Sequence, residues 1–281
     1  MKITKKNILE ILIFLQDVAY EAGEEILKFQ KKKQHLQITN KGADGIASEA
    51  DEASEKIILE ALKKKFPKSE VLSEEAFSKN KKDTFKKASE SEFIWLVDPL
   101  DGTNNFVNGI PIYAVSIALL NKKNVILGLV YNPLSGECFY AGKGIGSFLV
   151  DYRINPLKKY KLSRGKNKKE MNECIFSPAP VYDIGHKFER QLSVFKKNIS
   201  GARAVRRLGS AALELCYVAS GNFDAYWEKN LKPWDVAAAQ IICEEAGVKI
   251  SDFNGGAFHP YKESVIAAAQ PLHSRIVGKI K

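Results

Sequence analysis

The sequence has few cysteines, and this removes two classes of site. The four cysteines stand at positions 138, 174, 216 and 243, and no two of them form a Cys-x-x-Cys pair. A disulfide framework or a thiolate zinc site needs closer and more regular spacing. We therefore expect reduced, buried thiols, as in a protein of the cytoplasm.

The chain also lacks long apolar runs. Nowhere does it contain the roughly 18 consecutive apolar residues that a membrane span needs. The N-terminal stretch could suggest a signal peptide, but Glu10, Gln16 and Asp17 interrupt its apolar residues. Those apolar residues recur every three or four positions, which is typical of an amphipathic helix. The sequence thus predicts no membrane partner.

Motifs for several other chemistries are missing. The four histidines, at 35, 186, 259 and 273, show no metal-ligand spacing and take part in no evident Ser-His-Asp arrangement. The Gly-rich stretch at 142 to 146 lacks the following helix and acid of a dinucleotide site, so we predict a hairpin turn there. Ser210 lacks the nucleophile-elbow pattern.

Positive charge is present in excess, with a formal net charge of +10. The lysines stand in short scattered groups, mostly beside apolar residues at helical spacing, which favours solvated helix faces. No RNA- or DNA-binding signature accompanies them. Nucleic acid is therefore a partner that the sequence allows but does not favour.

The 281 residues, 45% of them hydrophobic, can bury a large core. Periodicity predicts helices at 5 to 33 and 51 to 66, and further helices near 188 to 197, 209 to 221 and 235 to 247. Strand-like runs between them, several in hairpin order, favour layered α+β structure over a Rossmann sheet. A polar seam near 150 to 170 suggests an N-terminal subdomain, 1–155, and a C-terminal subdomain, 156–281.

The stretch "WLVDPLDGTNNF", residues 95 to 106, is the most informative one. Asp98 follows an apolar run that predicts a buried strand, so its side chain should emerge where that strand ends. Pro99 cannot continue the ladder and should turn the chain so that Asp101 points to the same side. Two carboxylates confined together repel each other unless a cation lies between them. Hard ions such as Mg²⁺ prefer oxygen ligands, so a magnesium site is plausible.

The residues after these acids suit an anion. Gly102 permits close approach of backbone to ligand, and Thr103 opens a predicted helix whose first N–H groups face outward. Such a terminus binds phosphate. The motif therefore predicts a site in which a phosphate ester is held between Mg²⁺ and backbone amides. An ordinary strand-to-helix turn is the competing interpretation.

Other acids stand in similar places. Glu74 and Glu75 follow a short apolar run, while Asp235 and Asp51 each begin a predicted helix. Each has a purely structural alternative, because adjacent exposed acids are common and an aspartate at a helix start can simply be a cap.

Taken together, "DPLDGTNNFVNGIPIYAVSIAL" and "WDVAAAQIICEEAG" closely resemble the two signatures of the inositol monophosphatase family, a branch of the lithium-sensitive, magnesium-dependent phosphatases that includes fructose-1,6-bisphosphatase. The resemblance covers about residues 41 to 260. It implies a layered αβαβα sandwich and a homodimer. One departure is "DGIASEAD", which is one residue longer than the family's pattern before Asp51 and has Ser48 for threonine, so the roles of Lys41 and Asp44 stay open.

The resemblance also implies site residues. The metal ligands would be the carboxylates of Glu74, Asp98, Asp101 and Asp235 and the carbonyl of Leu100. Asp51 and Thr103 would be hydrogen-bonded to each other and, with Glu74, would orient the attacking water. The substrate would meet the residues Gly102, Thr103, Gly209, Ser210, Ala211 and Glu228, the last accepting hydrogen bonds from ring hydroxyls.

The implied activity is hydrolysis of a phosphate monoester, with inositol 1-phosphate as the leading substrate. Two or three Mg²⁺ ions would serve as cofactors, with Mn²⁺ as a substitute and Li⁺ as an inhibitor. Relatives act instead on fructose 1,6-bisphosphate, adenosine 3',5'-bisphosphate, histidinol phosphate or NADP. The remaining alternative is a binding role on RNA or the transcription machinery, with which the basic charge is compatible.

Overall fold

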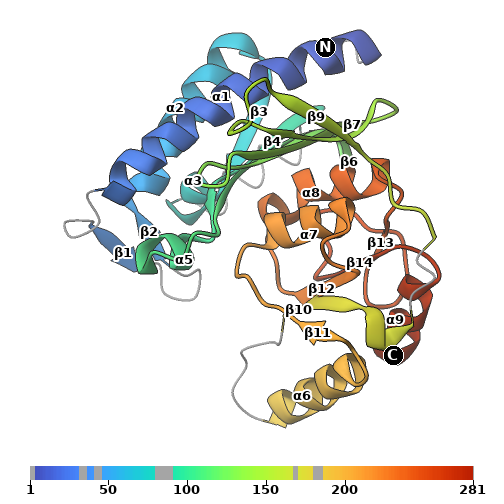
Figure 1. The fold of residues 1–281 in the computed structure, drawn as a ribbon. Coiled ribbons are helices and arrows are strands. Elements are labelled where there is room, and N and C mark those ends of the chain that lie inside the picture. The colour runs from blue at the N-terminus through green and yellow to red at the C-terminus, as the bar shows by residue number, and fades with distance from the viewer. Residues whose placement is uncertain are drawn as a thin grey trace.

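The computed structural model describes residues 4–31, 37–40, 46–79, 91–166, 170–179 and 186–280. These residues form five layers in the order helix, sheet, helix, sheet, helix (Figure 1). The predicted αβαβα sandwich is therefore confirmed. Lys41, Asp44 and His35 lie outside the described residues.

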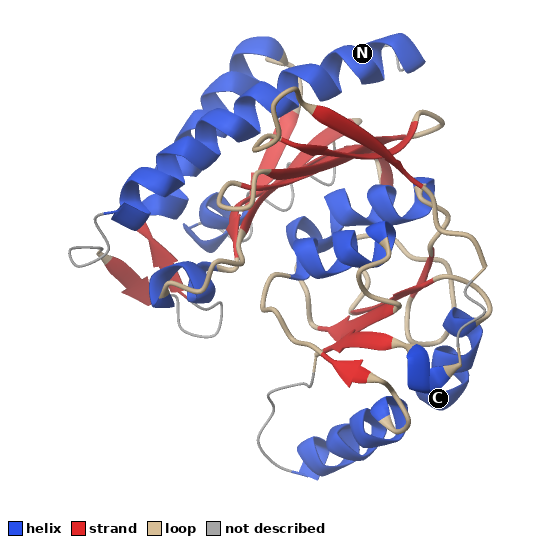
Figure 2. Cartoon of the chain, in the orientation of Figure 1, coloured by secondary structure: helices blue, strands red, loops and turns tan. Residues whose placement is uncertain are grey.

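A mixed seven-stranded sheet forms the second layer, with strand order β3-β4-β5-β6-β7-β8-β9. Figure 2 shows this sheet in red, with blue helices on either side of it. Only β3 and β4 pair in parallel; every later pair is antiparallel. The strands are β3 Glu70–Ser73, β4 Phe93–Asp101, β5 Ala114–Asn121, β6 Asn124–Asn132, β7 Glu137–Gly142, β8 Gly146–Asp151 and β9 Lys158–Leu162. The stretch at 142 to 146 is the turn from β7 to β8, as predicted.

Two long helices, α1 Lys5–Lys31 and α2 Glu49–Lys65, cover the outer face of this sheet (Figure 1). Their apolar residues share one hydrophobic cluster with the odd-numbered residues of β4, such as Trp95 and Val97. The periodicity of α1 predicted this docking, because Ile8, Ile11 and Leu12 are all buried. Among the described residues, no helix is long and apolar enough to cross a membrane.

The middle layer consists of α7 Ala211–Ser220 and α8 Pro233–Glu245. Both helices are apolar almost all round because each lies between two sheets. Trp234 and the thiols of Cys216 and Cys243 are buried in this layer. All four cysteines are free and buried, as the sequence predicted.

The second sheet has five strands in the order β11-β10-β12-β14-β13. Its outer face is covered by α6 His186–Ile199 and α9 Leu272–Ile280 (Figure 1). The strands are β10 Ile175–Pro178, β11 Ala204–Val205, β12 Ala225–Lys229, β13 Lys249–Ser251 and β14 Ser264–Ala268. The division of the chain at 155/156 stays a prediction; the first sheet itself continues to Leu162.

Short elements complete the chain, and two of them are helices that follow β3 and β4. They are the hairpin β1 Ile38–Asn40 with β2 Ile46–Ser48, the helices α3 Glu74–Lys79 and α5 Thr103–Asn108, and the 3-10 helix η3 Met171–Glu173. Helix α3 follows β3 directly and α5 follows β4 after a single residue, Gly102. Both helices therefore begin near the same end of the two parallel strands.

The expectation that the first strand of the motif ends at Asp98 is wrong, because β4 runs on to Asp101. Asp98 pairs with Ser116 and Asp101 pairs with Ala114, so β4 advances by three residues where β5 advances by two. This extra residue makes a β-bulge in β4. Pairing with β3 ends earlier, at Val97. Pro99 is tolerated because it falls in the bulge, beyond the last residue that pairs with β3.

Candidate active site

The bulge in β4 brings the two acids of the motif to one side of the sheet. In a regular strand, Asp98 and Leu100 would share a face. Here the side chain of Leu100 packs in the outer hydrophobic cluster, while the carboxylate of Asp101 reaches the start of α7 on the inner side. Ser54 of α2 donates a hydrogen bond to the carbonyl of Pro99 at 2.8 Å and holds the bulge in place.

Asp101 is fixed by the loop that precedes α7. Its Oδ2 accepts hydrogen bonds from the hydroxyl of Ser210 at 2.6 Å and from the backbone N–H of Ala212 at 2.8 Å. Burial raises the pKa of Asp101 to about 7; these hydrogen bonds oppose the rise, and the charges of Glu214 and Glu74 add to it. Two of the predicted substrate residues, Ser210 and Ala211, are thereby brought next to a predicted metal ligand.

Asp98 lies at the centre of the acidic residues. It is 2% exposed, and its Oδ1 accepts the N–H of Leu100 at 3.1 Å. Burial raises its pKa most, and the negative charges of Glu74, Asp101 and Asp235 raise it further. Glu74, Asp98, Asp101 and Asp235 come from three separate segments of the sequence. They therefore lie close enough together for their charges to affect one another's pKa values.

Asp235 is the third residue of α8 and not its cap. Its Oδ2 accepts the N–H of Lys232, the residue before the helix, at 2.8 Å, and Pro233 occupies the first helical position. Burial raises the pKa of Asp235, and the nearby charges of Asp101 and Glu74 add to the rise. The capping interpretation is thus partly right, because one carboxylate oxygen caps α8 while the side chain faces the other acids.

Asp51 occupies the matching position in α2. Its Oδ2 accepts hydrogen bonds from the N–H and the hydroxyl of Ser48, at 2.8 and 2.6 Å, so Ser48 is the cap and Asp51 the third helical residue. Its Oδ1 accepts the hydroxyl of Thr103 at 2.9 Å. Burial raises the pKa of Asp51 to about 6, against the lowering effect of these hydrogen bonds. The predicted Asp51–Thr103 hydrogen bond is present.

Glu74 stands where β3 passes into α3, and it is half-buried. Its charge raises the pKa values of Asp51, Asp98, Asp101 and Asp235. It therefore lies among both the acids of β4 and the Asp51–Thr103 pair, as the predicted double role requires.

The two predicted substrate loops lie against each other. Gly102 has a φ of +96°, and a Cβ added there would come within 3.0 Å of the carbonyl oxygen of Ile112 and 3.4 Å of that of Gly209. Asn105 joins the same loops, because its Nδ2 donates to the carbonyls of Ile112 and Leu208, each at 2.7 Å. Sequence reasoning missed Asn105, since an asparagine in a short helix carries no sign of such a bridge.

Glu228, at the end of β12, already has partners. Arg207 forms a two-pronged ion pair with it, with Nη1 and Nη2 at 2.7 and 2.8 Å from the carboxylate oxygens, and the hydroxyl of Tyr226 donates to it as well. The expected role of Glu228 as an acceptor for ring hydroxyls stays a prediction. Arg207 was missed, because "RAVRRLGS" looks like an ordinary basic surface segment.

The donor set of the site fits hard divalent cations. Carboxylates crowded together with raised pKa values are the arrangement that a cation stabilises, and carboxylate and carbonyl oxygens are the ligands of Mg²⁺. Within the part of the chain that the structure describes, no three Asp, Glu, His or Cys side chains form a ready-made metal-holding group. In each of Asp98, Asp101 and Asp235, one carboxylate oxygen accepts a backbone N–H.

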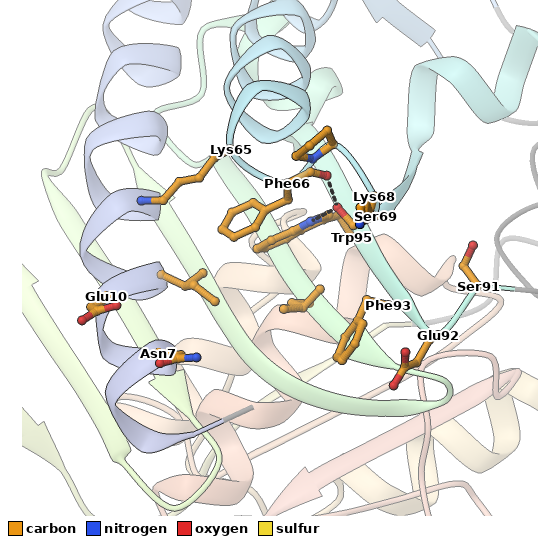
Figure 3. Close-up of a pocket in the computed structure, with 13 residues that line it drawn as sticks. Asn7, Glu10, Lys65, Phe66, Lys68, Ser69, Ser91, Glu92, Phe93 and Trp95 are labelled. Carbon is orange, nitrogen blue, oxygen red and sulfur yellow. Dashed lines mark hydrogen bonds between the residues drawn. The ribbon is translucent and has the colours of Figure 1, made fainter. Parts of the chain in front are cut away.

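A cavity of about 640 Å³ lies at the other end of β4 and does not belong to this site. Phe66, Phe93 and Trp95 line it, with Lys65 at its edge, and the indole N–H of Trp95 donates to Ser69 (Figure 3). The acids of the cluster are not among its lining residues. The candidate active site at Asp98 and Asp101 lies at the opposite end of β4 from this cavity.

Comparisons with known proteins identify the family and agree with the fold. The model of the inositol monophosphatase family matches residues 7–281. The chain is 36% identical over 265 residues to a protein named Nus factor SuhB from Pasteurella multocida, covering 94% of this chain and 92% of that protein. It is 35% identical over 273 residues to an inositol-1-monophosphatase from Mesorhizobium japonicum, covering 96% of each.

Solved structures are similar over nearly the whole chain. The extragenic suppressor protein SuhB from Bartonella henselae superposes with a TM-score of 0.83 at 32% identity, covering 97% of this chain and 98% of that one. An IMPase from Thermotoga maritima gives a TM-score of 0.78 at 27% identity, covering 96% of each. The protein whose acids meet at the bulge of β4 therefore belongs to the inositol monophosphatase family.

Proposed function

We propose that this protein is a magnesium-dependent phosphomonoesterase that hydrolyses inositol 1-phosphate or a similar polyol phosphate by in-line attack of water. Membership of the family supports phosphatase activity. The observation that carries the proposal is the meeting of Glu74, Asp98, Asp101 and Asp235 in one electrostatic cluster. The Gly102 and Gly209 loops lie beside that cluster and would receive the phosphate and its leaving group.

Glu74, Asp98, Asp101 and Asp235, with the carbonyl of Leu100, would hold two or three Mg²⁺ ions. Such ions, when bound, lower the pKa of water and neutralise charge on the phosphoryl and leaving oxygens. The backbone N–H groups of Gly102 and Thr103 would bind the phosphate, because α5 starts there. Mn²⁺ as a substitute and Li⁺ as an inhibitor are part of the same proposal.

Asp51 and Thr103 would orient the attacking water and receive its proton. The Thr103 hydroxyl has Oδ1 of Asp51 at 2.9 Å and the carbonyl of Leu100 at 3.1 Å as acceptors for its hydrogen, and its oxygen can accept a hydrogen bond from water. Asp51, with its pKa raised to about 6, is a suitable proton acceptor near neutral pH.

Replacing Thr103 by valine tests this arrangement. Valine keeps the shape of the side chain but loses the hydroxyl, so we expect kcat to fall about 10²-fold or more, as for loss of a proton-transfer partner. Mg²⁺ affinity from calorimetry should change little, since the carboxylates remain. A matched control is Ser78→Ala, which removes a half-buried hydroxyl that donates to the carbonyl of Glu74 within α3. Unchanged kcat in Thr103→Val contradicts the assignment.

Phosphate release from a panel of esters tests the function itself. The panel contains inositol 1-phosphate, fructose 1,6-bisphosphate, adenosine 3',5'-bisphosphate and NADP, each with Mg²⁺ and with EDTA. We expect turnover that requires Mg²⁺ and is highest for inositol 1-phosphate. Equal rates in EDTA contradict the metal, and a preference for a nucleotide moves the assignment to one of the alternatives.

A second candidate function is a binding role in transcription. Its support is that several relatives carry the name Nus factor SuhB, together with the net charge of +10. Retention of RNA at moderate salt by a variant without metal ligands would support it, and loss of all binding there would leave only the enzyme. Cytoplasmic location and a homodimer complete the proposal.

A further inference from the structure

Arg207 lies at the centre of a polar corner beside the acid cluster. We call Arg207, Glu214, Tyr226 and Glu228 the substrate corner. Its position follows from contacts of the loop that Arg207 begins, because Leu208 donates its N–H to Glu214 and accepts Asn105 of α5 at its carbonyl, and Ser210 donates to Asp101 at 2.6 Å. A phosphate bound at Gly102 would therefore direct its leaving group toward this corner.

Buried contacts hold the corner rigidly. Glu214 is fully buried in α7 and accepts hydrogen bonds from the hydroxyl of Ser177 and from the N–H of Leu208, the latter at 2.9 Å. Its Oε2 lies 3.3 Å from Nη1 of Arg207. Arg207 thus has one carboxylate beneath it and a second, Glu228, paired with both of its terminal nitrogens. Such two-pronged pairs fix the plane of the guanidinium.

This pairing changes what Glu228 offers to a substrate. A bare carboxylate repels a second anionic group and attracts hydroxyl donors. Here both oxygens of Glu228 accept N–H bonds from Arg207, and one also accepts the hydroxyl of Tyr226. Arg207 carries five N–H donors, and its contacts with the described residues use three of them. The side chain of Arg207 is 30% exposed, so a ligand can reach the others.

We propose that Arg207 sets the substrate range of this site: by screening Glu228 and offering its remaining N–H donors, it admits leaving alcohols that carry a second anionic group as well as neutral polyols. The class is a phosphate monoester whose alcohol also bears a carboxylate or a phosphate. The inference rests on the proposed phosphomonoesterase activity.

Two matched substrate pairs test the inference. Glycerol 3-phosphate and 3-phosphoglycerate differ in a carboxylate on the alcohol, and fructose 1-phosphate and fructose 1,6-bisphosphate differ in a second phosphate on it. For each pair, kcat/KM is measured with Mg²⁺ for the more anionic and the less anionic member, and the first value is divided by the second. This ratio is compared among wild type, Arg207→Met and Glu228→Gln. Arg206→Met is the control, since this neighbouring arginine is exposed and its side chain donates only to the carbonyl of Val205 among the described residues.

The two variants should shift the ratio in opposite directions. Arg207→Met uncovers Glu228 and should lower the ratio about tenfold, whereas Glu228→Gln removes the negative charge and should raise it, since differential charge contacts set such ratios. Arg206→Met should leave it unchanged. A shift in only one pair identifies the carboxylate or the phosphate as the preferred group.

A purely structural role of Arg207 would lower kcat/KM for both members of each pair equally. A ratio within about twofold of wild type in both variants, less than the differences that pocket contacts usually make, overturns the inference. Absence of phosphate release from every ester by the wild type would instead overturn the proposed function.

Discussion

Replacing Asp98 by asparagine should reduce kcat by about 10³-fold or more, equivalent to about 4 kcal/mol of transition-state stabilisation. Asparagine has nearly the same shape, and its side-chain oxygen can still accept the N–H of Leu100. It lacks the charge at the centre of the cluster, where Glu74, Asp101 and Asp235 all act on the carboxylate. The measurement is phosphate release from inositol 1-phosphate at saturating Mg²⁺.

Stability distinguishes loss of the site from loss of the fold. Without Mg²⁺, Asp98→Asn should melt at the same temperature as the wild type or higher, because one of several mutually repelling buried charges has been removed. Added Mg²⁺ should raise the melting temperature of the wild type more than that of the variant, since a ligand stabilises in proportion to its binding. Near-normal turnover of Asp98→Asn would refute the assignment.

Asp252→Asn serves as the matched control for this experiment. Asp252 accepts hydrogen bonds from Lys262 and from the N–H of Gly256 near β13, and these interactions lower its pKa despite the opposing effect of burial. Its loss should reduce the free energy of unfolding but leave kcat unchanged. The same chemical change thus separates a charge needed for catalysis from one that stabilises a loop.

Replacing Gly128 by valine should cause the largest loss of stability among the changes considered. Gly128 lies in the middle of β6, directly under α8. A Cβ added there would come within 2.6 Å of both Cα and the carbonyl oxygen of Ala238 and within 2.9 Å of Ile241. Backbone atoms cannot rotate away, so α8 must move. Overpacking usually costs 1–3 kcal/mol, and we expect about 3 kcal/mol here.

This displacement should also reach the active site, because α8 carries Asp235. We expect a drop in melting temperature of about 5–10 °C together with a lower kcat/KM. Gly165→Val is the control, since a Cβ at Gly165 meets nothing within 4 Å, and it should change neither quantity. A Gly128→Val protein with wild-type melting temperature would mean that the sheet and α8 are not packed this closely.

Local patterns predicted the elements whose signals are short-range. The three- and four-residue spacing in α1 follows from one buried face, and apolar runs separated by turn residues mark the strands β5 to β7, which are buried on both faces. The boundaries near Asp51 and Asp235 were less exact, because an aspartate at the third helical position looks like a cap when only the sequence is read. The strand through Pro99 was missed because a bulge depends on its neighbours.

The residues of the candidate site divide in the same way, into those that the sequence predicts and those that only the tertiary structure brings together. Residue types and order determined that Asp98, Asp101, Gly102 and Thr103 form one motif, since three-residue spacing and a following helix start are properties of the local chain. Only the tertiary structure decided that the bulge turns both acids inward, that Asp51 bonds Thr103, and that Arg207 covers Glu228. These contacts join residues distant in the chain, and pairing between distant charges is set by packing of the layers, which leaves no pattern in either segment alone.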